Sequence, residues 1–160
     1  MQLNQCFLTS LFILFFLPSI ALSLPLKVDP PGEKMVIVDP VEHRWGAYDP
    51  NGNLIRSGLA SAGADWCPDM KQACHTDTGS YRIISLGNKN CVSPSFPIPK
   101  GGAPMPYCMY FTKYQALHGS YELSATKNIS HGCVRMRVSD AEWLRYHFVK
   151  IGTLVEIESY

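Results

Sequence analysis

The chain has 160 residues and a formal net charge of +1; 17% of its residues are charged and 46% are hydrophobic. This balance is typical of a folded globular protein and excludes a disordered chain. A charge so close to neutral creates no long-range positive field, so we expect no nucleic acid among its partners.

The first 23 residues have the pattern of a secretory signal peptide. The apolar run within Phe7–Ser23 is too short to span a membrane comfortably, and the small residues Ala21 and Ser23 suit cleavage after Ser23. All charged side chains lie at or after Lys27. We therefore expect a signal peptide at residues 1–23, with an uncleaved anchor as the alternative. The mature protein is expected to be periplasmic or secreted, without a membrane span.

The rest of the chain is predicted to be mainly β. Residues 24–34 are rich in Pro and predict an extended lead-in, whereas Met35–Asp39 has the apolar and β-branched residues of a buried strand. The turn sequence DPNG at Asp49–Gly52 separates two strand-like runs and predicts a hairpin. Other strand-like runs follow at residues 79–87, 107–114, 115–120 and 152–158, and the five prolines of Asn90–Pro106 predict an irregular segment.

One helix is predicted near the carboxyl end. Ser139 and Glu142 have the spacing of a capping box, and Asp140–Phe148 carries apolar residues at helical spacing. Few helices and many Gly and Pro turns favour a β-sandwich or an open barrel of six to eight strands, with one helix packed on it. We expect residues 35–160 to form one domain and the protein to be a monomer.

Two neighbouring segments carry the residues that suggest chemistry, SHGCVRM at Ser130–Met136 and LHGS around His118. A free thiol has a pKa of about 8.5, so little of it is the reactive thiolate at neutral pH. A histidine base that accepts the thiol proton removes this limit on reactivity. In this interpretation Cys133 is a nucleophile and His118 its base. The amides of Gly132 and Cys133 can stabilise an oxyanion, and the carbonyl of Gly119 can orient the imidazole.

Two other interpretations of these segments stay open at this point. A metal site can be drawn from Cys133, His131, His118 and His75, but the paired ligand spacing typical of zinc sites is absent. In an extended segment, His131 and Cys133 also point to opposite faces. The third interpretation is a structural loop with a buried thiol.

Five segments in chain order resemble the catalytic domain of the L,D-transpeptidases, of the YkuD/ErfK type. They are the opening strands at 35–63, TDTGSYRI at 76–83, MPYCMYF at 105–111, the HGS and SHGCVRM pair, and GTLVEI at 152–157. Asp77 stands where the family usually has a proline. The resemblance implies that Cys133 is the acylated nucleophile and His118 the base, oriented by Gly119.

The same resemblance assigns further residues to substrate binding. Arg135 matches the family's arginine, and its planar guanidinium suits a substrate carboxylate, with a structural ion pair as the alternative. Ser130 is expected to bond within the site or to be a plain loop residue. Tyr107 is expected to form a wall of the pocket or to pack in the core, and Gly132 belongs to the oxyanion site.

The resemblance implies peptidoglycan remodelling outside the bacterial cytoplasm, without a metal or organic cofactor. Cys133 would attack the diaminopimelate carbonyl of a tetrapeptide stem, expel D-alanine and pass the acyl group to an amine. Hydrolysis of the same thioester, as in an L,D-carboxypeptidase, is one alternative. Short secreted members of the family are sometimes named enhanced entry proteins, so a secreted cell-wall-binding or host-contact module is the other.

The mature chain has an odd number of cysteines, so four can pair in an oxidising compartment and leave one thiol. The four are Cys67, Cys74, Cys91 and Cys108. They allow three pairings, of which we favour Cys67 with Cys74 and Cys91 with Cys108, so that Cys133 stays reduced. A zinc site made of Cys67, Cys74, His75 and Cys91 is the alternative.

Overall fold

The computed structural model describes residues 24–160, so the signal peptide predicted at residues 1–23 lies outside the described residues. Within 24–160 the strands join into one nine-stranded sheet in the order β4-β9-β1-β2-β3-β8-β7-β6-β5. Their bounds are β1 (Met35–Asp39), β2 (Arg44–Tyr48), β3 (Leu54–Ser61), β4 (Gly79–Arg82), β5 (Ser85–Leu86), β6 (Met109–Tyr110), β7 (Ala116–Gly119), β8 (Val134–Met136) and β9 (Leu154–Ile157).

The predicted hairpin is confirmed by the antiparallel pair β2 and β3. Asp49 organises its turn, because its side chain accepts hydrogen bonds from the backbone N–H groups of Asn51 and Asn53, both at 2.9 Å. The lead-in at residues 24–34 lies beside this turn, where Val28 donates its N–H to Gly52 O at 2.9 Å. Leu24 is buried in a small cluster with Ile37 and Tyr48.

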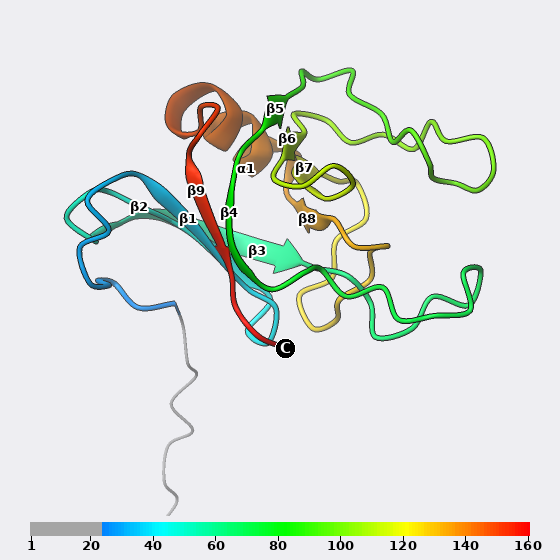
Figure 1. The fold of residues 1–160 in the computed structure, drawn as a ribbon, viewed down its shortest axis with the longest axis horizontal. Helices are drawn as coiled ribbons and strands as arrows, with labels where there is room; N and C mark the ends of the chain where they lie inside the picture. Colours follow the sequence, from blue (N-terminus) through cyan, green and yellow to red (C-terminus); the bar gives the residue numbers. More distant parts are fainter. Residues whose placement is uncertain (1–23) are drawn as a thin grey trace, which may run out of the picture.

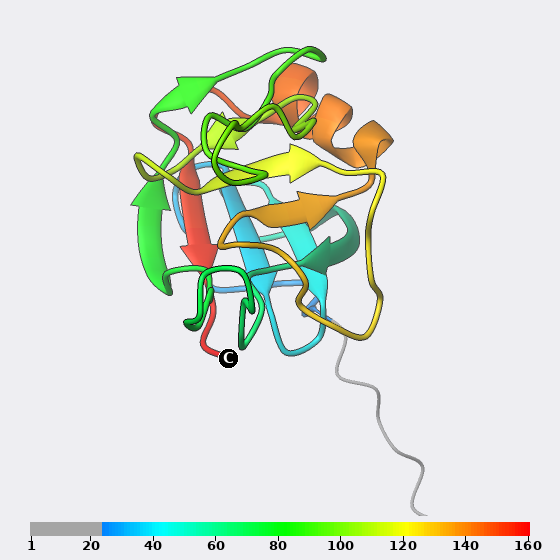
Figure 2. The same cartoon turned by 90° about the vertical axis from the view of Figure 1, so that its right-hand side faces the viewer.

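The segment predicted as a single strand at residues 79–87 is divided between the two edges of the sheet. Its first half, β4, pairs with β9 at one edge, and its second half, β5, pairs with β6 at the other. The residues between them bond to both sides, since Ile83 donates to Thr153 O at 3.0 Å and Ile84 to Tyr110 O at 2.8 Å. The sheet therefore curls until its edges approach one another (Figure 2), which is the open-barrel form of the expected mainly β fold.

The predicted helix exists, but it begins earlier than the capping box indicated. α1 (Val138–Trp143) has Arg137 at its N-cap without a side-chain hydrogen bond, and it continues directly into a π-helical turn, η1 (Leu144–Phe148). Because β8 ends at Met136, the chain enters the helix almost without a connecting loop, and Ser139 falls inside the first turn. The capping-box prediction is therefore wrong.

The helix covers one end of the curled sheet and packs against β7 (Figure 1). Ala141, Leu144 and Phe148 join the main hydrophobic core, which also contains Leu117 of β7 and Val134 of β8. β7 and β8 thus have one face in the core and the other face available for a site. Within residues 24–160 no helix is long and apolar enough to cross a membrane.

Candidate active site

The parallel pairing of β7 and β8 brings the two motif segments together. His118 lies opposite Arg135 in this register, and Leu117 lies opposite Val134. Side chains alternate along a strand, and Leu117 and Val134 are fully buried in the core. His118, Cys133 and Arg135 consequently lie on the other face, and all three line one cavity.

The His118 imidazole is buried and has a fixed orientation. Its Nδ1 lies 2.8 Å from the carbonyl oxygen of Gly119. Since a carbonyl oxygen only accepts, Nδ1 carries the hydrogen and Nε2 is the unprotonated nitrogen. Burial lowers the pKa of His118 to about 4, and the nearby Arg135 charge acts in the same direction. The ring is therefore a neutral base at neutral pH.

Cys133 is the free cysteine among the described residues. Burial raises the pKa of its thiol, while a hydrogen bond from the Ala116 backbone and the charge of Arg135 oppose this effect. At neutral pH the thiol and the imidazole are thus both neutral.

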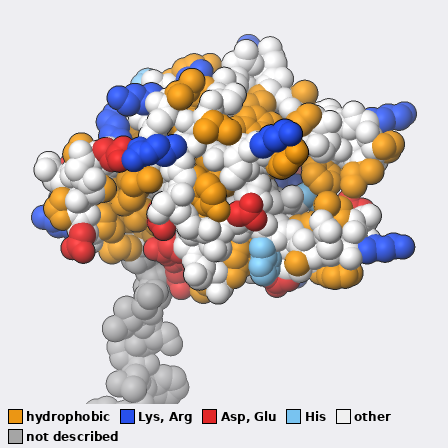
Figure 3. Space-filling view, viewed as in Figure 1, with side chains coloured by type: hydrophobic (Ala, Val, Ile, Leu, Met, Phe, Trp, Pro, Cys, Tyr) orange, Lys and Arg blue, Asp and Glu red, His pale blue; other side chains and the backbone are white. Residues whose placement is uncertain are grey.

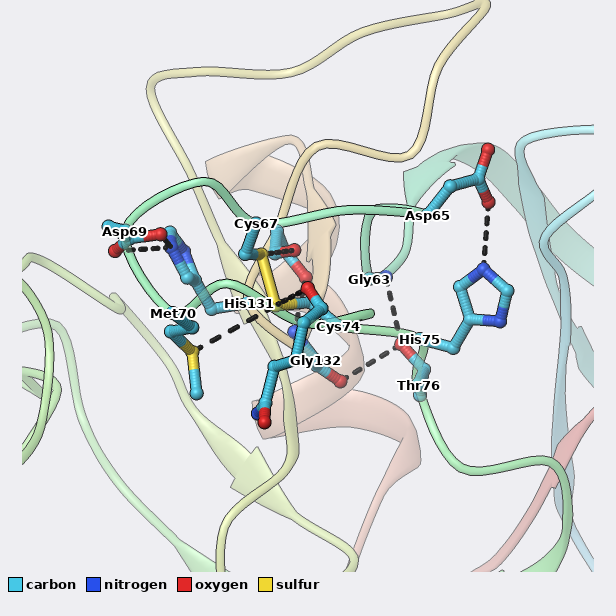
Figure 4. Close-up of a disulfide and its surroundings, with 12 residues drawn as sticks. Gly63, Asp65, Cys67, Asp69, Met70, Cys74, His75, Thr76, His131 and Gly132 are labelled. Carbon is cyan, nitrogen blue, oxygen red and sulfur yellow. Dashed lines mark hydrogen bonds and ion pairs between the residues drawn. A yellow bond between two sulfur atoms is a disulfide. The ribbon is translucent and has the colours of Figure 1, made fainter.

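Ser130 and Thr76 hold the turn that carries Cys133. The Ser130 hydroxyl donates to Cys133 O and accepts from the N–H of Gly132 at 3.0 Å. Gly132 has φ +115°, a conformation that favours glycine. Thr76 Oγ1 donates to Gly132 O at 2.9 Å and accepts from the N–H of Gly63 at 3.0 Å (Figure 4). The amide of Gly132 therefore donates to Ser130, and its predicted oxyanion role stays a prediction.

Of the two residues expected to contact substrate, Arg135 lines the cavity and Tyr107 does not. The Nη1 atom of Arg135 lies 3.3 Å from a carboxylate oxygen of Glu122. The hydroxyl of Tyr107 donates to Glu142 at 2.7 Å, and its ring packs edge-on against Tyr146. Tyr107 therefore packs in the core, which was the alternative to its expected role as a wall of the pocket.

Tyr110 lies in the cavity where sequence reasoning expected Tyr107. It is opposite Ala116 in the antiparallel pair of β6 and β7. Ala116 is two residues before His118, so both point to the cavity face, and Tyr110 joins them there. The register of β6 against β7 places Tyr110 in the cavity. A strand of only two residues has no alternating pattern from which this register could be predicted.

The cavity has a volume of about 630 Å³, and the Pro-rich segment at Asn90–Pro106 provides much of its wall. This segment and the loop around residues 65–75 project on the right of Figure 1, and the surface is hollowed between them in Figure 3. Sequence reasoning missed several lining residues, among them Phe96, Tyr114, Gln115, Tyr121 and Glu122. Most are loop residues without a motif, so no local pattern marks them.

Both favoured disulfides are present, Cys67–Cys74 and Cys91–Cys108. The alternative zinc site is therefore wrong, because three of its four ligands are disulfide sulfurs. Cys67, Asp69 and His131 offer ligand atoms within 4.8 Å of one another, but the Cys67 sulfur is in its disulfide (Figure 4) and cannot be a thiolate.

The other histidines of the metal interpretation have different partners. His131 lies in the cavity wall, where Nε2 is 3.0 Å from Asp69 and the ring stacks on Phe96. His75 is bonded to Asp65 at 2.7 Å and stacks on Tyr160 with the ring centroids 4.0 Å apart. The ligand set proposed from Cys133, His131, His118 and His75 is not brought together as one group within residues 24–160.

The YkuD family model, which describes the L,D-transpeptidase catalytic domain, matches residues 33–157. The chain therefore belongs to the L,D-transpeptidase family, a family of enzymes. A solved L,D-transpeptidase from Xylanimonas cellulosilytica is 25% identical with a TM-score of 0.67, and the match covers 79% of this chain and 60% of that one.

L,D-transpeptidase 3 from Mycobacterium tuberculosis, solved with a faropenem-derived adduct, is 22% identical. Its TM-score is 0.62, and the match covers 79% of this chain and 60% of that one. The matched region thus spans about 60% of the length of these two structures. The comparison with curated proteins found no match.

Proposed function

We propose that this protein is a peptidoglycan L,D-transpeptidase that uses Cys133 as its nucleophile and His118 as its base. One observation carries the proposal. His118 Nδ1 is held by Gly119 O at 2.8 Å, which leaves Nε2 as the acceptor in the same cavity as the free Cys133 thiol. A thiol, a neutral oriented imidazole and a space for substrate are the requirements of acyl transfer.

The acyl-enzyme forms in the first half of the proposed reaction. Cys133 Sγ attacks the carbonyl carbon at the L-centre of diaminopimelate while His118 Nε2 takes the thiol proton. The C–N bond to D-alanine then breaks, and His118 returns the proton to the leaving amine. The product is a thioester on Cys133 and free D-alanine, with His118 neutral again.

An amine resolves the thioester in the second half. The side-chain amine of another stem attacks the thioester carbonyl, its proton passes through His118, and the thiol of Cys133 is regenerated. Lowering the pKa of His118 to about 4 suits both halves, because the imidazole must be neutral each time that it accepts a proton. The proposal needs no metal or organic cofactor.

Other residues assist in this proposal without taking part in bond changes. Gly119 O orients the imidazole, and Ser130 keeps the carbonyl of Cys133 and the amide of Gly132 fixed. Arg135 binds a substrate carboxylate. For Arg135→Lys we propose a larger loss than a charge-conserving change normally causes, since a planar bidentate donor is removed.

We also propose secretion of residues 24–160 as a monomer after removal of residues 1–23. The two disulfides support an oxidising compartment, where such bonds persist. A periplasmic or secreted location also suits peptidoglycan stem peptides as partners.

Product analysis tests the proposal directly. The mature chain is incubated with disaccharide-tetrapeptide, with Cys133→Ala as the control, and the products are identified by mass spectrometry. Cross-linked dimers with release of D-alanine are the expected result. Tripeptides alone would make the protein an L,D-carboxypeptidase, and unchanged substrate would favour a cell-wall-binding module.

A further inference from the structure

The cavity contains one pair of opposite charges besides the catalytic residues. Among the described residues that line it, Glu122 is the only acid and Arg135 the only lysine or arginine. Arg135 Nη1 lies 3.3 Å from Glu122 Oε2. The charges in this cavity are therefore a single adjacent cation and anion, with the histidines His118 and His131 as the other titratable bases.

This ion pair is poorly suited to holding the fold together. The side chain of Glu122 is 82% exposed, whereas that of Arg135 is 19% exposed. An exposed ion pair with a long contact contributes little to stability. The backbone of Glu122 is fixed separately by Ser120, whose hydroxyl donates to Glu122 O at 2.8 Å and accepts from its N–H at 3.1 Å. The carboxylate can thus turn toward a ligand while its backbone stays in place.

An adjacent cation and anion are complementary to a zwitterion. A free α-amino acid group presents a carboxylate and an ammonium on one carbon, and a guanidinium and a carboxylate can bind these two groups side by side. The donor in the proposed function carries such a group at the D-centre of its diaminopimelate side chain. The acyl carbon that Cys133 attacks lies at the other end of this side chain.

The spacing of the residues agrees with the length of this side chain. Cys133 lies directly before β8 and Arg135 lies within it, on the same side of the chain, so their Cα atoms are about 6.6 Å apart. Three methylene groups separate the two centres of diaminopimelate, so the acyl carbon and the D-centre lie roughly 6 Å apart when extended. A donor bound at Cys133 can therefore place its free zwitterion at Arg135 and Glu122.

We propose that Glu122 is a specificity-determining residue that binds the ammonium of the donor's diaminopimelate side chain while Arg135 binds the adjacent carboxylate. This inference rests on the proposed function and adds to it a residue outside the two motifs. Glu122 would thus distinguish a donor stem with a free amine at the D-centre from one whose amine is blocked. The side chain of Glu122 acts on substrate recognition and not on the attack by Cys133.

Two donors and two variants test this inference. With the enzyme in excess, release of D-alanine in the first turnover is measured for the natural disaccharide-tetrapeptide and for the same donor acetylated at the D-centre amine. The first turnover is used because acylation of Cys133 needs no acceptor amine, and acetylation removes that amine as an acceptor. Glu122→Gln keeps the shape of the side chain and removes its charge. Glu33→Gln is the matched control, because Glu33 forms another surface ion pair, with Arg82 at 2.8 Å, outside the cavity.

We expect Glu122→Gln to lower kcat/KM for the natural donor about fivefold, through KM, as is typical of a lost charge pair near water. The acetylated donor should be poorer with the wild type and unaffected by Glu122→Gln. Glu33→Gln should behave as the wild type with both donors. Equal effects of Glu122→Gln on both donors would overturn the inference. A gain in activity would also overturn it, because Glu122 would then block access of the substrate to Arg135.

A carbapenem separates a failure of this inference from a failure of the proposed function. It acylates the nucleophile but has no diaminopimelate side chain, so its reaction rate with Glu122→Gln should equal that of the wild type. A changed rate would mean that Glu122 acts on the nucleophile and would contradict the inference. If the wild type releases no D-alanine, the proposed function and this inference both fail. If it does and the two donors respond alike to the variant, the inference alone fails.

Discussion

At the scale of the residue, the surroundings of His118 and Cys133 determine the form in which they meet a substrate. Burial disfavours the charged form of each, lowering the pKa of His118 to about 4 and raising that of the Cys133 thiol. A preformed thiolate and imidazolium pair is therefore disfavoured. In the proposed reaction, the proton transfer then belongs to the same step as the attack on the carbonyl.

Removing either member of the pair should remove activity. Cys133→Ala should abolish D-alanine release, and Cys133→Ser should be nearly inactive because a hydroxyl is much harder to ionise than a thiol. His118→Ala should lower kcat by about 10²-fold or more, the usual effect of losing a general base. Turnover by Cys133→Ala above about a tenth of the wild-type rate would disprove the assignment.

The pH dependence of acylation should reflect the neutral pair. The pKa of His118 is lowered to about 4, so the imidazole stays unprotonated as pH falls to about 5. As pH falls further, the imidazole becomes protonated and can no longer act as a base. We expect kcat/KM for D-alanine release to be nearly constant from about pH 6 to 8 and to fall as pH drops through about 4. A decrease that begins near pH 6.5, the ordinary pKa of histidine, would contradict this order of events.

At the scale of the element, the end of β7 and the turn before β8 position the proposed catalytic residues His118 and Cys133. A Cβ atom at Gly119 would lie 2.9 Å from Cα of Val138, so glycine lets the helix start approach the strand that carries His118. Asp77 donates its N–H to the side chain of Gln115 at 3.0 Å. The proline usual in the family at this position has no N–H, so this hydrogen bond depends on the departure from the family pattern.

Thr76 gives a test of the turn. Thr76→Val keeps the shape but removes the hydroxyl that joins the N–H of Gly63 to the carbonyl of Gly132. Since both partners are buried, we expect the free energy of unfolding to fall by about 1–3 kcal/mol, and kcat with it. Urea unfolding and D-alanine release measure the two effects. Thr126→Val, at an exposed position, is the control, and equal behaviour of the two variants would show that the turn does not depend on this bond.

At the scale of the whole molecule, the disulfides constrain the loops that wall the cavity. Cys91–Cys108 closes the loop that contains the Pro-rich segment onto the residue before β6, which stabilises the fold by about 3 kcal/mol in the chain-entropy model. Cys67–Cys74 closes the loop that carries Asp69, the partner of His131. Cys91–Cys108 thereby ties one wall of the cavity to the sheet, whereas Cys67–Cys74 holds the loop at the other wall closed.

Counting thiols tests this arrangement. The mature protein, purified from an oxidising compartment and denatured without reductant, should show one reactive thiol, and five after reduction, because the two disulfides contain four of its five cysteines. Peptide mapping should assign the single thiol to Cys133. A disulfide that contains Cys133, or five free thiols without reductant, would contradict the structure and the mechanism together.

Local patterns in the sequence were sufficient for most strands, for the hairpin and for the pairing of the cysteines. Strand alternation and turn chemistry act over a few residues, so the strand at Met35–Asp39 and the turn at Asp49–Gly52 could be predicted without the rest of the chain. The family motif also indicated His118 and Cys133, which the structure brings into one cavity.

The tertiary structure alone decided how these pieces face one another. Tyr110 and not Tyr107 reaches the cavity because of the register of β6 against β7, and residues 79–87 split because the curled sheet offers two edges to one segment. Glu122 meets Arg135 only because β7 and β8 run side by side. Register, edge pairing and loop contacts depend on residues far apart in the chain, and a local pattern carries no information about them.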